Sequence, residues 1–170
     1  MKVFAFQKNT DLHALSAGTT ITNFLKCEKI KKCRRFVFWD IEVATDNQKK
    51  WMDQLLAKTY YLLNTNKEDY YLESIPTSQK EGQFHVLVQI NNTLFEDQSD
   101  LIKKINDKCQ TQVTQLKKSL LWDLVVDANS LEEATTYVQQ QLLDSAKHPF
   151  LLNPIFEKSE ILSSTAIISG

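Results

Sequence analysis

Alternating apolar and polar residues predict a strand near the start of each half of the chain. Val86, Val88 and Ile90 recur with a period of two inside the segment Phe84–Ile90, which is the spacing of one face of a strand. The opening segment Lys2–Gln7 is apolar at both parities. We therefore expect its sheet to be covered on both faces or to associate with a second sheet.

Apolar residues at helical spacing follow each of these strands and predict four helices. The first two are expected over Leu15–Lys26 and Ser99–Cys109. The other two are expected over Asn47–Leu63 and from Ser130 to Leu142. Asp46 is the expected N-cap of the helix that starts at Asn47, and Ser130 stands three residues before a glutamate, which is the spacing of a capping box.

Short apolar segments complete each half with three further strands. We predict two hairpins, each a short strand followed by a longer one: Lys29–Cys33 with Phe36–Val43, and Val113–Leu116 with Leu120–Val126. A closing strand follows in each half, over Asp69–Ile75 and Phe156–Leu162. The order β-α-β-β-α-β, met twice, predicts an α+β protein of two tandem ferredoxin-like halves, with antiparallel sheets and helices on one face.

An internal repeat supports the division into halves. The run Trp39-Asp40-Ile41-Glu42-Val43 returns as Trp122-Asp123-Leu124-Val125-Val126, 83 residues further along. The same spacing aligns Val3 with Val86, and near the end of each half a spacing of 89 residues aligns Glu68 with Glu157. We predict a first half at 1–75, a polar linker at 76–83, a second half at 84–163 and an apolar tail at 164–170.

Composition excludes several classes of protein. Apolar residues make up 42% of the chain, charged residues 24%, and the net charge is −1, which predicts a packed cytoplasmic protein. Only three glycines occur, and neither a G-x-G-x-x-G nor a P-loop motif is present, so a nucleotide-binding enzyme of those classes is not expected. Cys27, Cys33 and Cys109 form no C-x-x-C pair, so neither a disulfide framework nor a zinc site is expected.

Scattered polar residues give no catalytic or metal site. Asp40 and Glu42 share one face of a strand, as paired carboxylates do, but the second copy has valine in place of Glu42; this favours a solvated or interface face. The three histidines, His13, His85 and His148, lack metal-ligand spacing. No serine or cysteine lies in a catalytic signature, so we expect no independent enzymatic activity and no cofactor or metal ligand in this chain.

Two features leave alternatives open. The basic run Lys29, Lys31, Lys32, Arg34 and Arg35 suits RNA binding on a ferredoxin-like sheet, but the missing RNP1-like phrase and a pI near 6.3 favour a solvated strand edge. Trp39 and Trp122 occupy equivalent positions, where either core packing or a subunit interface would place a tryptophan.

The phrase that closes each half resembles a known family. Leu62-Leu63-Asn64-Thr65-Asn66-Lys67-Glu68-Asp69-Tyr70-Tyr71 and Leu151-Leu152-Asn153-Pro154-Ile155-Phe156-Glu157 are similar to the phrase before the last strand of PurS, the small subunit of phosphoribosylformylglycinamidine synthase. The tandem form also resembles the N-terminal region of the large single-chain synthases. The family's hairpin usually has Arg-x-Gly-Lys, whereas this chain has Arg34-Arg35-Phe36-Val37 and Lys117-Lys118-Ser119-Leu120, without glycine.

The resemblance implies a non-catalytic structural subunit of purine biosynthesis that joins a glutaminase to an ATP-dependent synthetase. ATP and magnesium would belong to the synthetase. The candidate partner interface comprises Trp39, Trp122, Asn64, Glu68, Asn153 and Pro154. The alternatives are, first, a small-ligand regulatory module of the ACT type, which has the same element order, and then an RNA-binding ferredoxin-like protein. Pairing of two copies of the chain stays open.

Overall fold

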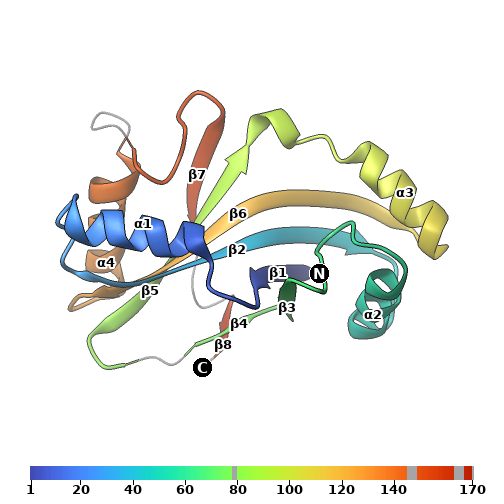
Figure 1. The fold of residues 1–170 in the computed structure, drawn as a ribbon, viewed down its shortest axis with the longest axis horizontal. Helices are drawn as coiled ribbons and strands as arrows, with labels where there is room; N and C mark the ends of the chain where they lie inside the picture. The colour runs from blue at the N-terminus through green and yellow to red at the C-terminus, as the bar shows by residue number, and fades with distance from the viewer. Residues whose placement is uncertain (78–79, 145–148, 163–166, 170) are drawn as a thin grey trace.

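The computed structural model describes residues 1–77, 80–144, 149–162 and 167–169 (Figure 1). The elements in chain order are β1 (Lys2–Gln7), α1 (Leu12–Asn23), β2 (Ile30–Val43), α2 (Gln48–Lys58), β3 (Glu68–Leu72), β4 (Ile75–Pro76), β5 (Gln83–Asn92), a 3-10 turn (Thr93–Phe95), α3 (Ser99–Cys109), β6 (Val113–Asp127), α4 (Leu131–Val138), a π-helical turn (Gln139–Leu143), β7 (Glu157–Leu162) and β8 (Ile168–Ser169). No helix in these ranges is long and apolar enough to cross a membrane.

Six strands form one antiparallel sheet in the order β3-β1-β2-β6-β5-β7. The first three strands of this order come from the first half of the chain and the other three from the second half. The halves meet edge to edge through β2 and β6, which pair along almost their whole length. The protein therefore belongs to the α+β class, with a single sheet shared by both halves.

The helices lie in two groups over one face of the sheet, and each group contains a helix from each half (Figure 1). Ala14 and Ile21 of α1 pack in one core cluster with Ala134 and Val138 of α4, above β5 and the C-terminal part of β6. In the other cluster, α2 packs with α3 above β1 and the C-terminal part of β2. Because the first helix of each half crosses to the other group, both cores need both halves.

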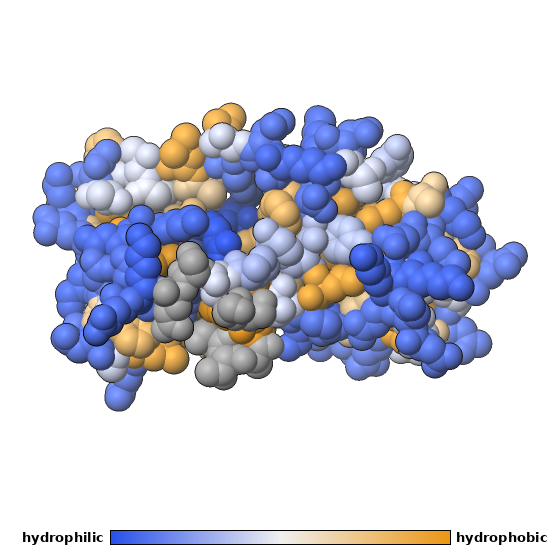
Figure 2. Space-filling view, turned by 90° about the horizontal axis from the view of Figure 1, so that it is seen from below, coloured by the Kyte–Doolittle hydropathy of each residue, from blue (hydrophilic) through white to orange (hydrophobic). Residues whose placement is uncertain are grey.

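An aromatic cluster occupies the opposite face of the sheet. Phe4 stacks on Phe38 with ring centroids 5.0 Å apart, and Ile75 and Ile167 are buried against this cluster. Ile75 belongs to β4, which pairs in parallel with β8, so the described end of the tail packs within the chain. Figure 2 views the side on which β4 and β8 lie, and shows apolar groups in the middle with hydrophilic residues at both ends.

The two predicted hairpins are wrong, because β2 and β6 each run as one long strand. The expected turns fall at Arg34-Arg35 and at Lys117-Lys118-Ser119, which contain none of the glycine, asparagine or proline residues that favour a tight reversal. Charged side chains at these positions continue the alternation of the strand. In the pairing of β2 with β6, Arg34 faces Asp123 and Lys117 faces Asp40, so cross-strand attraction favours the extended chain.

The register of the long strands repeats with the predicted spacing. Trp39 pairs with Lys118, and Trp122 pairs with Arg35, so each pair becomes the other when 83 residues are added to one partner and subtracted from the other. The first strands depart from this spacing. Trp39 faces Val3, but Trp122 faces Val88 and not Val86. A shift of two residues keeps the same side chains on the same face, so apolar alternation does not distinguish the two alignments.

Helix α1 begins earlier and ends earlier than predicted. Asp11 caps it by accepting hydrogen bonds from the N–H groups of His13 and Ala14, at 2.9 and 3.1 Å. Its apolar residues Leu12 and Leu15 are exposed, so the apolar stripe starts later than the helix. After the helix, Lys26 adopts a positive φ of 57°, which a continuing helix excludes.

The other element ends show how caps overrule periodicity. Asn47, not Asp46, caps α2 by accepting a hydrogen bond from the Lys50 N–H, and α2 ends at Lys58, several residues before the predicted end. Helix α3 has its predicted bounds. Ser130 caps α4 as predicted by accepting a hydrogen bond from the Glu133 N–H. The predicted strand Asp69–Ile75 is split into β3 and β4 at Glu73, whose φ is 62°.

Candidate functional site

The phrase shared by the two halves forms the same turn before β3 and before β7. The Glu68 carboxylate accepts a hydrogen bond from the Asn64 N–H at 2.7 Å, and Glu157 accepts one from the Asn153 N–H at the same distance. The side-chain oxygen of each asparagine accepts a hydrogen bond from the N–H two residues later, at 3.1 Å in both turns. The same residue types therefore perform the same structural role twice.

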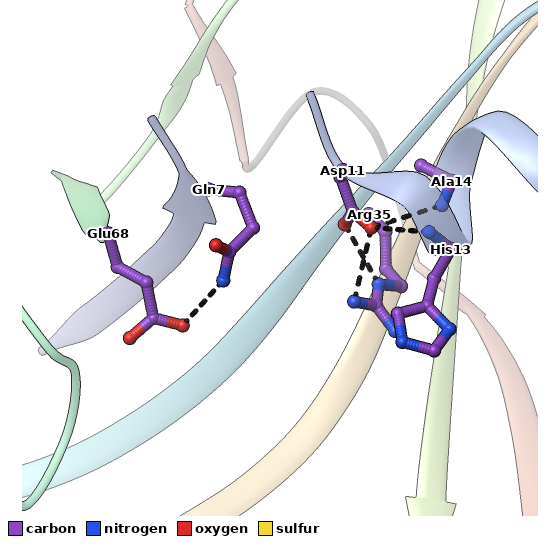
Figure 3. A network of polar contacts seen from close by, with 6 residues as sticks. All are labelled: Gln7, Asp11, His13, Ala14, Arg35 and Glu68. Carbon is purple, nitrogen blue, oxygen red and sulfur yellow. Dashed lines mark hydrogen bonds and ion pairs between the residues drawn. The ribbon is translucent and has the colours of Figure 1, made fainter. Parts of the chain in front are cut away.

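Each of these glutamates also connects its turn to the first strand of its half. Gln7 Nε2 donates to Glu68 Oε1 at 3.0 Å (Figure 3), and Asn92 Nδ2 donates to Glu157 Oε1 at 3.5 Å. Of the predicted interface residues, Asn64, Glu68 and Asn153 thus form hydrogen bonds within the turns. Pro154 is exposed beside them. The structure places the two turns at separate sites, since β3 and β7 are the opposite edges of the sheet.

The two tryptophans pack in the core and not on the surface. Trp39 is 2% exposed and Trp122 is 7% exposed, one in each helix-side cluster. Trp39 Nε1 donates to the Leu62 carbonyl at 3.1 Å, which connects β2 to the turn before β3. Trp122 Nε1 is buried and has no hydrogen-bond partner among the described residues.

Most of the basic run is paired with carboxylates from other elements. Lys29 pairs with Glu133, Lys31 with Asp127, Arg34 with Asp123 and Arg35 with Asp11, at 2.5 to 3.3 Å. These pairs join β2 and the residue before it to β6, to α4 and to the N-cap of α1. The run therefore connects elements of the chain in place of forming a free basic strip.

Asp123 of β6 lies at the centre of a buried polar cluster that the sequence analysis missed. Its side chain is fully buried. Asp123 Oδ2 accepts hydrogen bonds from Arg34 Nε, at 2.8 Å, and from Arg34 Nη2. Asp123 Oδ1 lies 2.7 Å from His85 Nδ1. Because an ionised carboxylate only accepts hydrogen bonds, His85 Nδ1 carries the proton.

A sequence signal for this cluster exists in the strand itself. Asp123 stands in the otherwise apolar run Leu120–Val126, and a charge in a buried strand requires a partner. Its partners lie 89 and 38 residues away in sequence, so only the pairing of β6 with β2 and β5 identifies them.

A cavity of about 360 Å³ opens at this cluster. Arg34 and His85 line it together with Lys31, Lys32 and Lys80, and the remaining lining residues are Pro76, Thr77, Gln83 and Val125. No carboxylate is among these lining residues. The site is therefore an electropositive pocket above a buried aspartate.

A second, more apolar cavity of about 340 Å³ lies between the end of β1, β2 and the start of α1. Phe6 and Tyr71 stack in its wall with ring centroids 4.6 Å apart. Arg35 Nε donates to Asp11 Oδ2 at 3.0 Å, which fixes the N-cap of α1 against β2 (Figure 3). The loop residues Asn9 and Thr10 complete this cavity.

The remaining candidate groups carry no redox or metal chemistry that the geometry supports. Burial raises the pKa of the Cys33 thiol to about 12 and also raises the pKa of the Cys27 thiol, so both stay protonated at neutral pH. In the described ranges no group of three or more His, Cys, Asp and Glu side chains is placed to hold a metal ion. Asp40 is half-buried and Glu42 exposed, and His148 lies outside the described residues.

Comparison of the chain with models of known protein families and with curated proteins found no match.

Proposed function

We propose that this protein is a PurS-like, non-catalytic structural subunit that joins a glutaminase to the ATP-dependent synthetase of phosphoribosylformylglycinamidine synthase. The observation that carries the proposal is the pair of matching turns at Asn64–Glu68 and Asn153–Glu157. The residues that resemble the PurS phrase are the ones whose hydrogen bonds build these turns. The similarity therefore extends from the letters of the sequence to the structural role of the side chains.

The shared sheet supports the tandem form of this proposal. Each half supplies three strands, in the mirrored order β3-β1-β2 and β6-β5-β7, and the first helix of each half packs against the other half. Two copies of one unit, joined along their long second strands, account for this order. On this proposal each half derives from one ferredoxin-like unit whose two central strands are continuous.

The second turn offers the better contact surface for an enzyme partner. Ile155 is 77% exposed and Phe156 and Leu94 are exposed beside it, since Thr93 N–H donates to the Phe156 carbonyl at 2.8 Å. The position equivalent to Ile155 in the first turn is Asn66. Exposed apolar groups of this kind commonly mark contact sites.

Purification of the tagged chain from its native cells, with glutamine and nucleotide supplied, tests the proposal. We expect both a glutaminase and a synthetase to be retained. Ile155→Lys should reduce their retention, whereas Asn66→Lys adds the same charge to the equivalent turn and should not. If neither enzyme is retained by the unmodified chain in repeated preparations, the proposal is wrong.

A functional assay separates assembly from chemistry. On this proposal, removing the chain from a preparation that contains both enzymes should abolish product formation from glutamine, while formation from added ammonia persists. Loss of both reactions would instead assign a catalytic role to this chain.

The apolar cavity near β1 favours a second candidate, the ACT-type regulatory module. It lies at the loop after the first strand, around Asn9 and Thr10, where a module of that type holds its ligand. An amino acid that raised the melting temperature of the isolated protein would support this candidate, because a ligand that binds only the folded state stabilises it. Retention of the two enzymes without any such shift would exclude it.

A further inference from the structure

We propose that the electropositive cavity at His85 binds a phosphoryl group carried by a small molecule. This site is separate from the turns on which the proposed function rests, and no part of the argument below uses the resemblance. The argument depends on the orientation of His85, on the charges that line the cavity and on the absence of this cluster from the equivalent place in the first half.

The buried aspartate fixes His85 in one tautomer and one orientation. Asp123 receives the Nδ1 proton, so the other ring nitrogen, Nε2, remains to interact with a ligand. No residue in the described part of the chain forms a hydrogen bond with Nε2. A histidine held in this way by a carboxylate is stabilised when it becomes an imidazolium, which is the form that donates a hydrogen bond to an anion.

The cavity is lined by an excess of positive charge. Lys31, Lys32, Arg34 and Lys80 line it. Two of these cations are balanced, Arg34 by Asp123 and Lys31 by Asp127. Lys32 and Lys80 form no ion pair with any described residue. An anion that enters the cavity would therefore meet unbalanced ammonium groups together with a preoriented imidazole.

The fold does not require this cluster. The equivalent of Asp123 in the first half is Asp40, which faces Lys117 across the strands. Asp40 is half-buried and forms no ion pair with a described residue. By the register of β1 and β5, the equivalent of His85 would precede Met1. Groups that stabilise the fold, such as Glu68 and Glu157, recur in both halves, whereas the histidine cluster occurs in one, so its role goes beyond support of the sheet.

The chemistry and the size of the site favour a phosphoryl group on a small molecule. Ammonium and imidazolium groups around one point suit a compact anion with several acceptor oxygens. A cavity of about 360 Å³ is near the lower end of the range for small-molecule sites, roughly 300–1,000 Å³. A nucleic acid would need an extended basic track, and the ion pairs of Lys29, Lys31, Arg34 and Arg35 leave little of one.

Titration of the full chain with inorganic phosphate and pyrophosphate, followed by NMR of the histidine rings, tests the proposal. We expect saturable binding, with the His85 Nε2 resonance shifting while that of His13 stays constant. His85→Asn keeps a donor near Asp123 and removes Nε2, and should weaken binding about tenfold or more, the effect of losing one hydrogen bond to a charged group. Lys32→Ala should weaken binding to a similar degree, and Lys49→Ala, on the exposed face of α2, should leave it unchanged.

Three results would overturn the proposal. The first is no saturation by either anion together with an unshifted His85 resonance. The second is equal binding by the wild type and by the His85 and Lys32 variants while their melting temperatures match that of the wild type. The third is tight, salt-sensitive binding of single-stranded RNA by a chain that binds neither phosphate nor pyrophosphate, which would assign the basic residues to a nucleic acid.

Discussion

Val37 and Leu120 face each other at the centre of the six-stranded sheet, and they are separated by the same 83 residues that separate the two tryptophans. They are therefore equivalent positions of the two halves that meet at one point. An approximate two-fold axis passes through this pair, and every other β2–β6 pair has an image on the other side of it. The repeat in the sequence thus becomes a symmetry of the sheet.

The buried Asp123 should contribute strongly to stability. Asp123→Asn removes the charge that balances Arg34 and should lower the free energy of unfolding by about 3 kcal/mol, because it leaves a largely buried cation without its partner. Urea denaturation measures the change. Asp40→Asn is the matched control at the equivalent position and should change stability by less than about 0.5 kcal/mol. Equal effects of the two substitutions would contradict this assignment.

The two turn glutamates should make similar and additive contributions. Glu68→Ala and Glu157→Ala each remove the acceptor of one backbone N–H and one side-chain amide, and each should cost about 1–2 kcal/mol. Because the turns lie at opposite edges of the sheet, the double variant should show the sum of the single effects. Glu160→Ala, on the exposed side of β7, serves as the control. A double variant no less stable than either single one would show that the turns are not independent.

The tryptophans should respond differently to removal of the indole N–H. Trp39→Phe loses the hydrogen bond to the Leu62 carbonyl, whereas Trp122→Phe loses a buried N–H that has no partner among the described residues. Both variants lose similar packing volume, so Trp39→Phe should be the less stable by about 1 kcal/mol. Thermal unfolding of the two variants measures the difference. A less stable Trp122→Phe protein would indicate an acceptor for that N–H in the folded chain.

Acid should weaken the capping box of α4. Hydrogen bonds from Lys29 and from Asn129 lower the pKa of Glu133 from an ordinary value of 4.5 to about 2. A depressed pKa contributes stability that is complete above the ordinary pKa and is lost as the pH falls toward the folded value. Stability should therefore decline between pH 4.5 and about 2, and Glu133→Gln should make this decline shallower. Glu132→Gln, one residue earlier, is the control; an identical effect of both would exclude the capping carboxylate as the cause.

The thiols of Cys27 and Cys33 should be inert in the native protein. Cys27 is buried in the core, and the pKa of Cys33 is about 12, so very little thiolate exists at neutral pH. Ellman's reagent should modify both far more slowly than it does in denaturant. Mass spectrometry identifies the labelled residue. Rapid labelling of Cys33 in the folded chain would contradict the protonated state inferred here.

Local signals in the sequence determined much of the secondary structure. The bounds of α3 and β1, the cap at Ser130 and the 83-residue spacing all follow from residues near one another in the chain, because periodicity and capping are properties of a few consecutive residues. The turn phrase is local in the same way, since Asn64 and Glu68 are only four residues apart.

Only the tertiary structure decided how these elements combine. The continuity of β2 and β6 depends on cross-strand pairing of charges such as Arg34 with Asp123, and the two-residue shift of the first strands preserves the apolar pattern and so leaves no trace in it. The exchange of α1 and α3 between the halves and the meeting of His85 with Asp123 depend on contacts between distant residues. A single chain specifies such contacts only through the free energy of the whole packed sheet, so no short segment of the sequence contains them.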